Sequence, residues 1–262
     1  MRTTDQRFQA ILTRNQTPTH QTIENDGVSN SIKTFVKRWP WFYNFLKHAF
    51  GPSHSPGSPY HPKRRIHDLL GNNPGNKIIL NLGSGTYRIH PEIINVDLFP
   101  FKEVDLVADI CALPIKDASV DGIVCEDVLE HIAGAPRLLK EISRVLKPGG
   151  TLILKVPFLY PYHSSPDDFF RWTANGIMFA LEESSFRVKE SGPHGGPMGA
   201  LQGVLMHIFA IMFSFGSNTA YFFLVQFFMV VFSPLKLLDP LFLLSPFSVE
   251  VASQLFVVAE KK

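Results

Sequence analysis

Glycine and polar residues follow each of four short apolar runs between residues 78 and 126. The runs are apolar on both faces, which predicts strands buried on both sides of a parallel sheet. The runs and the residues that follow them are Ile78–Leu82 with Gly83-Ser84-Gly85, Ile93–Val96 with Asp97, Leu106–Ala108 with Asp109 and Ile110, and Gly122–Cys125 with Glu126. Ligands of open α/β sheets bind at the carboxyl ends of such strands, so these residues predict one ligand site.

The residue types suit a cofactor that contains adenosine. Gly83 and Gly85 let the backbone approach a ligand closely and adopt positive φ. Asp97 can accept hydrogen bonds from both ribose hydroxyls. Asp109 can accept from an adenine amino group while Ile110 packs on the ring. The Gly-x-Gly sequence alone is weak support, because dinucleotide sites use the same device.

The block from about Lys77 to Ser191 resembles the class I S-adenosylmethionine (SAM)-dependent methyltransferases, in particular a methyltransferase type 11-like group. The run Arg-Val-Leu-Lys-Pro-Gly-Gly at 144–150 is among the more specific features, and Val128–Ile132 resembles the leucine-glutamate-histidine segment of the family. The resemblance implies that His131 is a structural partner near the cofactor. It implies SAM as cofactor and a cofactor site formed by Asn81, Gly83, Ser84, Gly85, Asp97, Asp109, Ile110 and Glu126, with Glu126 near the methionyl ammonium.

The connection between the first two predicted strands is unusually short. Only ten residues, Gly83 to Glu92, separate them, whereas parallel crossovers normally take a dozen or more and include a helix. A pyrophosphate binds at a helix N-terminus, and SAM has no phosphate. The short crossover therefore favours SAM over the nicotinamide cofactor of an oxidoreductase. A non-catalytic protein with a degenerate SAM-binding fold is the other alternative, and the retained Asp97 and Asp109 argue against it.

The loop from Pro157 to Thr173 follows the fifth predicted strand and overhangs the same edge of the sheet. His163 is its only side chain that titrates near neutral pH, Asp167 or Asp168 can orient it, and Arg171 can pair with either or hold a substrate anion. We predict His163, Asp167 and Arg171 as catalytic residues; the alternative is that they only brace the loop. A similar pattern occurs in methyltransferases that resemble those of glycan and cell-envelope pathways. Since the methyl group of SAM is already activated, no metal site is predicted.

The 262 residues suit one α/β domain with additions. We expect a disordered tail over 1–32, an aromatic and basic helical extension with a linker over 33–76, and the methyltransferase domain over 77–262 with an apolar insertion at 198–247. The domain is expected to be a Rossmann-like seven-stranded sheet with helices on both faces. The formal charge of +2 predicts no nucleic-acid partner.

The insertion has no Asp, Glu, Lys or Arg from Ser191 to Leu235. Its apolar runs, Leu201–Phe215 and Ala220–Phe232, are shorter than the ~20 residues of a spanning helix. They predict a helical hairpin that enters one leaflet of a membrane and returns; the alternative is a homodimer interface. The expected location is the cytoplasmic face of a membrane, and the acceptor is a small molecule, a lipid or a glycan.

Overall fold

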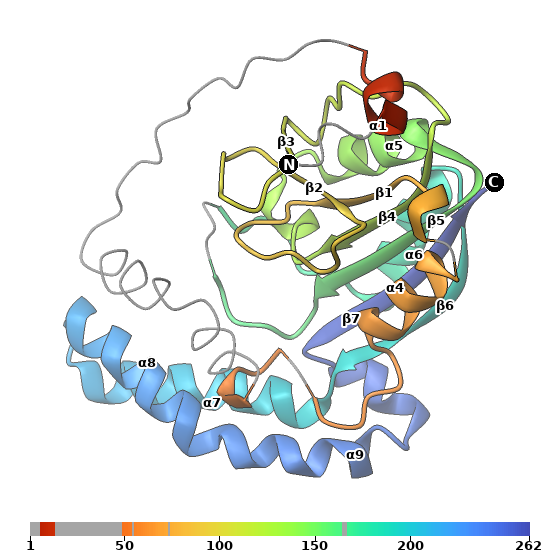
Figure 1. Cartoon of the computed structure of the whole chain (residues 1–262). Coiled ribbons are helices and arrows are strands. Elements are labelled where there is room, and N and C mark those ends of the chain that lie inside the picture. The colour runs from red at the N-terminus through yellow and green to blue at the C-terminus, as the bar shows by residue number, and fades with distance from the viewer. Residues whose placement is uncertain (1–5, 14–48, 54, 73, 164–166) are drawn as a thin grey trace.

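The computed structural model describes residues 6–13, 49–53, 55–72, 74–163 and 167–262 (Figure 1). Residues 33–48 of the predicted aromatic and basic extension and most of the predicted tail therefore lie outside the described residues. The described chain forms one mixed α/β sheet with helices on both faces, and a separate helical layer at one end.

The sheet has seven strands in the order β3-β2-β1-β4-β5-β7-β6, which confirms the predicted seven-stranded sheet. β1 to β5 are mutually parallel, and β7 runs antiparallel to both β5 and β6. The strands are β1 Ile79–Leu82, β2 Ile94–Asp97, β3 Leu106–Val107, β4 Val120–Glu126, β5 Leu146–Pro157, β6 Phe186–Gly195 and β7 Gln254–Lys261. All four residues of β1 and of β2 are buried, as the doubly apolar runs predict.

Helices cover both faces of the sheet (Figure 1). Helix α4, Pro62–Leu70, places Ile66 and Leu70 in a cluster with Ile79 and Val124 on one face. The other face packs against α5, Ala135–Val145, and α6, Ala174–Glu183, whose buried side chains belong to the larger core cluster. Thr173 caps α6 by accepting a hydrogen bond from the Gly176 N–H.

The connection between β1 and β2 contains no helix, in agreement with its short length. Arg88 holds it in place. Its guanidinium binds both carboxylate oxygens of Asp105 at 2.9 and 3.0 Å and donates to the carbonyls of Ile93 and Glu103. The Asp105 side chain is only 2% exposed, so Arg88 neutralises a buried charge.

Arg88→Met is expected to lower the free energy of unfolding by about 3 kcal/mol, because removing one partner leaves a buried charge uncompensated. Urea denaturation measures this change. Arg65→Met is the matched control, since Arg65 pairs with Asp68 and Glu190 on the surface and should cost about 1 kcal/mol or less. Equal losses in the two variants would contradict the role given to Arg88.

The structure differs from the predicted disordered tail at residues 6–13. Helix α1, Gln6–Ile11, places the side chain of Phe8 fully inside the main core cluster, and Leu12 forms an isolated antiparallel bridge with Ile115. The polar composition of the tail does not indicate that this short segment is ordered. The segment is fixed because the single aromatic side chain packs into the core of the sheet domain. The rest of the predicted tail is outside the described residues.

The apolar insertion forms a helical hairpin, as predicted. Its elements are α7 Pro197–Ser214, α8 Asn218–Phe232, η3 Ser233–Leu238, α9 Asp239–Phe242 and η4 Pro246–Val251. The insertion leaves and re-enters the sheet at one place, because Gly195 of β6 is paired with Gln254 of β7. Figure 1 shows α7, α8 and α9 together as a layer below the sheet domain.

The linker before α4 is fixed between the hairpin and the sheet. The buried carboxylate of Asp239 accepts hydrogen bonds from the Ser55 hydroxyl at 2.5 Å and from the Met198 N–H at 2.8 Å, at the N-terminus of α7. Gln202 of α7 donates to the Phe50 carbonyl at 2.6 Å. The hairpin is therefore anchored to the domain through long-range polar contacts at its base.

Candidate functional site

The glycine loop after β1 is tied to the end of β2 by Asp97. The Oδ2 atom of Asp97 accepts from the Gly85 N–H at 2.8 Å, and its Oδ1 atom accepts from the Phe99 N–H at 2.9 Å. Each carboxylate oxygen has a further lone pair for a ligand hydroxyl. Asp97 therefore shapes the loop as well as facing the predicted ribose position, a second role that the sequence does not indicate.

Gly83 is required by its surroundings. Its φ is +64°, and a Cβ atom at this position would lie 2.4 Å from a methyl carbon of Val128. This close approach places the segment after β4 directly against the glycine loop. The neighbouring Ser84 hydroxyl is buried and has no hydrogen-bond partner among the described residues, so it is an orphaned polar group at the predicted cofactor position.

The other predicted cofactor residues occupy the same edge of the sheet. They differ in how far their side chains are already engaged by other residues of the protein. Asp109 is exposed, and its Oδ1 atom accepts a hydrogen bond from the Cys111 N–H, while the adjacent Ile110 is buried. Glu126 forms an ion pair with Lys155 at 3.0 Å. Asn81 is buried and donates to Asn95 at 3.1 Å, so it clamps β1 to β2.

These residues fit SAM. The loop glycines are in the left-handed region, the Ser84 hydroxyl lacks a partner, and Asp97 and Asp109 keep acceptor capacity on adjacent strand ends. Ile110 offers an apolar surface beside Asp109. The set would hold ribose and adenine, and Glu126 would face the methionyl end.

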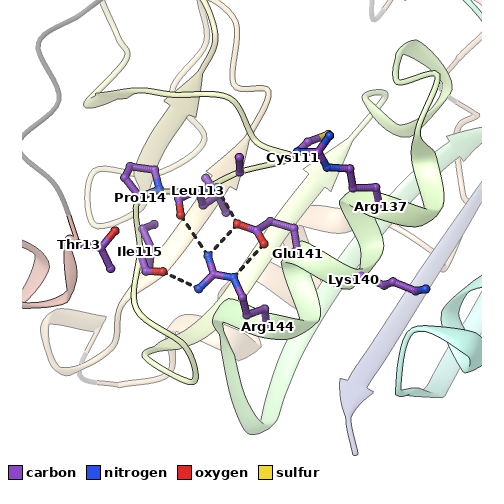
Figure 2. A pocket seen from close by; sticks show the side chains of 10 residues that line it. Thr13, Cys111, Leu113, Pro114, Ile115, Arg137, Lys140, Glu141 and Arg144 are labelled. Carbon is purple, nitrogen blue, oxygen red and sulfur yellow. Dashed lines mark hydrogen bonds and ion pairs between the residues drawn. The ribbon is translucent and has the colours of Figure 1, made fainter.

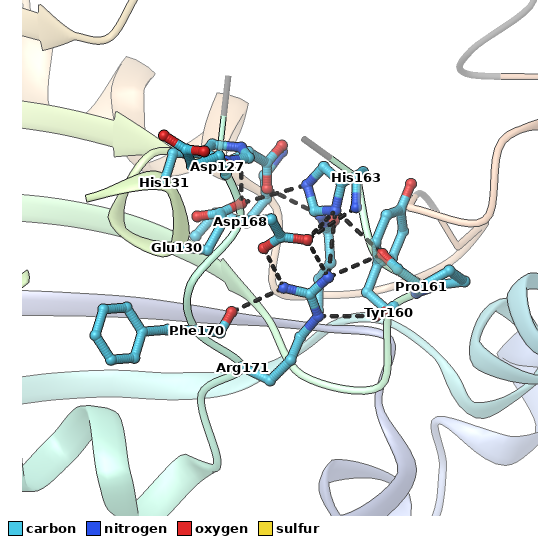
Figure 3. A network of polar contacts seen from close by, with 12 residues as sticks. Asp127, Glu130, His131, Tyr160, Pro161, His163, Asp168, Phe170 and Arg171 are labelled. Atoms are coloured by element: carbon cyan, nitrogen blue, oxygen red, sulfur yellow. Dashed lines mark hydrogen bonds and ion pairs between the residues drawn. The ribbon is translucent and has the colours of Figure 1, made fainter. Parts of the chain in front are cut away.

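The loop after β5 brings His163, Asp168 and Arg171 together (Figure 3). The Asp168 carboxylate binds the Arg171 guanidinium at 2.5 and 2.6 Å, and it accepts from the His163 N–H at 2.8 Å. Burial alone would raise the pKa of Asp168, but the hydrogen bonds from Arg171 and His163 outweigh it and hold the pKa below its usual range. Asp168 is therefore the carboxylate that organises the loop.

The structure does not bring the Asp167 side chain to this cluster. Asp167 is exposed, and it contributes its backbone carbonyl, which accepts from Nδ1 of His131. Of the two adjacent carboxylates, Asp168 thus takes the orienting position predicted for Asp167. The loop turns so that only one of two consecutive side chains can face Arg171.

Two residues beyond the predicted set complete the cluster. Glu130 and His131 lie in η2, Leu129–His131, directly after β4. The Glu130 side chain is fully buried, with its Oε1 atom 3.6 Å from Nε2 of His163 and 3.8 Å from Nε2 of His131. The Phe169 N–H donates to the Glu130 carbonyl at 2.7 Å, which joins the loop to η2. The Leu-Glu-His spacing was the available signal, but it does not indicate which side chain is buried.

The environment of His163 acts on its pKa in both directions. Burial lowers the pKa, whereas the Glu130 side chain, the Pro161 carbonyl and Asp168 raise it, and the net pKa is above the usual value. His163 therefore faces negative potential on the side of Glu130.

A separate cavity of about 650 Å³ lies beside α5 (Figure 2). Arg144 on its wall is engaged by Glu141 at 2.7 Å and by the carbonyls of Leu113 and Ile115. None of the predicted site residues lines this cavity. This cavity is therefore not part of the predicted site at the strand ends.

Comparison with known proteins identifies the class of domain that this chain resembles. The family model described as "Methyltransferase domain" matches residues 87–154. An uncharacterized methyltransferase of Schizosaccharomyces pombe is 37% identical over 94 residues, which are 29% of this chain and 37% of that protein. A probable SAM-dependent methyltransferase of Mycobacterium tuberculosis is 39% identical over 59 residues, covering 22% of this chain and 21% of that protein. The chain spans well under half the length of the curated relatives it matches.

Among solved structures, the [4+2]-cyclase SpnF superposes with a TM-score of 0.50 at 14% identity, covering 92% of this chain and 99% of that chain. This likeness shows the fold alone. Together with the family match and the strand order, it defines a class I methyltransferase fold. Residues 87–154 thus match a methyltransferase domain, and the relatives matched over parts of this chain include a probable SAM-dependent methyltransferase, which supports SAM as the cofactor.

Proposed function

We propose that this protein transfers the methyl group of SAM to an acceptor held at a membrane surface, on a lipid or a glycan. The observation that carries the proposal is a contact between the loop that follows β5, Pro157 to Thr173, and the hairpin. Pro161 lies against Gly203 of α7, where a Cβ atom would come within 3.0 Å of the proline ring. The same Pro161 carbonyl accepts from Arg171 at 2.9 Å, so the hairpin supports the loop that carries His163.

The surface of the hairpin suits hydrocarbon. Of the 24 large hydrophobic residues that are exposed in the described chain, 18 lie between Leu201 and Val251. Helix α8 has no buried residue at all. Helix α7 and the stretch Asn218–Phe242 have mean hydropathies of 1.4 and 1.8 and are long and apolar enough, by length and composition, to cross a membrane. A patch of this extent indicates a membrane or a protein partner.

Insertion into one leaflet accounts best for the length of the part of α7 that extends beyond the domain. Helix α7 has 18 residues and is about 27 Å long at ~1.5 Å per residue. Its first turns are buried against the domain through Gly199, Gln202 and Gly203. The 11 residues from Val204 to Ser214 then remain, or about 17 Å, which exceeds half of a ~30 Å hydrocarbon core but does not cross it. Both ends of the insertion meet at paired residues of the sheet, so they stay on one side.

The location follows from the same considerations. We place the catalytic domain on the cytoplasmic face, since Cys111 and Cys125 are both free thiols, which suits a reducing compartment. The Phe50 carbonyl accepts a hydrogen bond from Gln202 of α7. The sequence before Phe50 is rich in aromatic and cationic residues, a composition that suits an anionic lipid surface.

The residues of the chain contribute mainly by positioning. In the transfer, a lone pair of the acceptor forms the bond to the methyl carbon of bound SAM, the electron pair of the breaking C–S bond stays on sulfur, and the acceptor proton leaves. Asp97 and the glycine loop hold the donor. Arg171 and Asp168 fix His163, and His163 faces the acceptor.

Charges on the hairpin tip should abolish membrane binding. Ile211 and Phe215 are 64% and 91% exposed, so Ile211→Asp/Phe215→Asp should leave the domain folded. A charge inside hydrocarbon costs at least ~2.5 kcal/mol, so two should reduce liposome partitioning by about 100-fold or more. Flotation with vesicles of phosphatidylcholine and phosphatidylglycerol measures this, and methyl-labelled SAM with a membrane extract follows the product. The variant should bind SAM normally and lose labelling of lipid-linked material.

Phe179→Asp is the matched control, because Phe179 is 67% exposed on α6 and lies outside the hairpin. This variant should float with the vesicles and methylate lipid-linked material as the unchanged protein does. If the unchanged protein never floats and the double substitution only splits a dimer, the hairpin is a dimer interface. Label that appears only in water-soluble products would contradict a membrane-borne acceptor.

A further inference from the structure

We propose that Glu130, His131 and His163 form a binding site for a divalent transition-metal ion such as Zn²⁺. One carboxylate oxygen and the two imidazole nitrogens lie within 4.8 Å of one another. Glu130 and His131 come from η2 after β4, and His163 comes from the loop after β5, so the site joins the two segments that border the acceptor side (Figure 3).

The buried carboxylate of Glu130 needs a cation. Its side chain is fully buried, and neither oxygen has a hydrogen-bond partner among the described residues. The contacts at 3.6 and 3.8 Å to the two histidines are too long for hydrogen bonds. An ionised carboxylate in this position is costly unless a positive group completes its surroundings.

Both histidines present a lone pair to the centre of the cluster. Nδ1 of His131 donates to the Asp167 carbonyl, which can only accept. Nδ1 of His163 has its shortest contact, 3.2 Å, with the Pro161 carbonyl. In the tautomer with the proton on Nδ1, these bonds are made and each Nε2 offers a lone pair to an ion on the side of Glu130. A histidine that ligates a metal almost always donates its other ring N–H to a carbonyl, carboxylate or water.

The spacing of the ligand atoms is that of co-ligands. Two atoms that each lie ~2.1 Å from one tetrahedral ion are about 3.4 Å apart. The two distances from Oε1 of Glu130, 3.6 and 3.8 Å, are close to this value, and all three ligand atoms lie within 4.8 Å of one another. Two imidazoles and one carboxylate suit Zn²⁺ and similar ions, and three protein ligands leave a position open for water or substrate, as in catalytic sites.

An ion in this position would act on the acceptor. That role rests on the proposed methyl transfer, whereas the existence of the metal site does not depend on it. Val128, two residues before Glu130, packs on Gly83, so the cluster lies beside the cofactor loop. An acceptor hydroxyl or carboxylate at the open position would bind through oxygen, and metal binding would lower the pKa of a hydroxyl so that its proton passes to water before transfer. The inferred acceptor is therefore an oxygen nucleophile.

The test uses untagged full-length protein that has been stripped with EDTA. We expect about one Zn²⁺ per chain by calorimetry, and Co²⁺ should give the visible absorption of a site with nitrogen and oxygen ligands. Acetohydroxamate, a chelating oxygen ligand, should change that spectrum if a position is open. Glu130→Gln should weaken Zn²⁺ binding by more than the roughly 10–100-fold that loss of a supporting partner costs. His67→Ala is the matched control, since His67 is exposed on α4.

SAM binding is measured on every sample, which separates the two proposals. If Glu130→Gln does not fold, His163→Asn serves in its place, because the His163 side chain is 34% exposed. Folded, SAM-binding protein that takes up no Zn²⁺ or Co²⁺, or that binds them equally well in Glu130→Gln and His163→Asn, would overturn the metal site and leave the methyltransferase intact. Failure to bind SAM would instead count against the proposed function.

Discussion

Asp97→Asn is expected to weaken SAM binding by about 100-fold or more while the protein stays folded. The substitution removes the negative charge and turns one acceptor atom into a donor. One loop amide, either Gly85 or Phe99, then loses its acceptor, and the contacts with the ribose hydroxyls are lost or weakened. Each hydrogen bond to a charged group is worth ~1.5–3 kcal/mol, so two such losses correspond to at least about 100-fold.

A ligand comparison separates the ribose contact from the effect on the loop. S-adenosylhomocysteine and its 2′-deoxy analogue are titrated into both proteins by calorimetry. If Asp97 binds the hydroxyls, removing one should cost affinity in the unchanged protein and much less in Asp97→Asn, because interacting groups are not additive. Equal costs in the two proteins would show that Asp97 acts on the loop alone.

The positions of the predicted cofactor residues were accessible from sequence, because each residue is placed by the strand that precedes it. Asp97 ends β2 and Glu126 ends β4, so a correct prediction of the strands places both at the same edge. The absence of a helix between β1 and β2 followed from chain length alone. Asn81 shows the limit of this reasoning, since its side chain is used within the sheet through Asn95.

The acceptor half depends on contacts that sequence spacing does not determine. Asp167 and Asp168 are adjacent and chemically identical, and only the course of the loop decides which one meets Arg171. Glu130 is a charged residue in a polar-looking segment, yet its side chain is fully buried. Glu130 and His163 are more than 30 residues apart in the sequence and lie in the connections that follow two different strands.

The hairpin, the linker and the N-terminal helix also differ in how far the sequence predicts them. Apolar composition predicted the hairpin, and the strand pairing around it agrees with a prediction that both ends share one side. Composition did not predict that the linker is held by Asp239 through Ser55, because Ser55 lies in an irregular linker and Asp239 begins the short helix α9, 184 positions away. The buried Phe8 of α1 was missed for the same reason.

Asp168→Asn should lower kcat by about 100-fold or more and leave the dissociation constant of SAM nearly unchanged. Asp168 binds Arg171 through both oxygens and fixes the backbone of His163. An amide offers one acceptor, so the paired geometry with Arg171 is lost and an arginine in a partly buried site is left short of partners. A misplacement of ~1 Å in a positioned catalytic group can cost 10²-fold in rate.

Turnover is followed with methyl-labelled SAM and the membrane extract, and SAM binding by calorimetry. Hydrogen exchange at the His163 amide gives a readout independent of the acceptor, since that amide should exchange faster once its bond to Asp168 weakens. Asp167→Asn is the matched control, because the exposed Asp167 side chain contributes nothing to the cluster and its backbone carbonyl is retained. If Asp167→Asn loses turnover and Asp168→Asn does not, the loop is arranged differently from the structure, and the acceptor site cannot be built on His163 as held by Asp168 and Arg171.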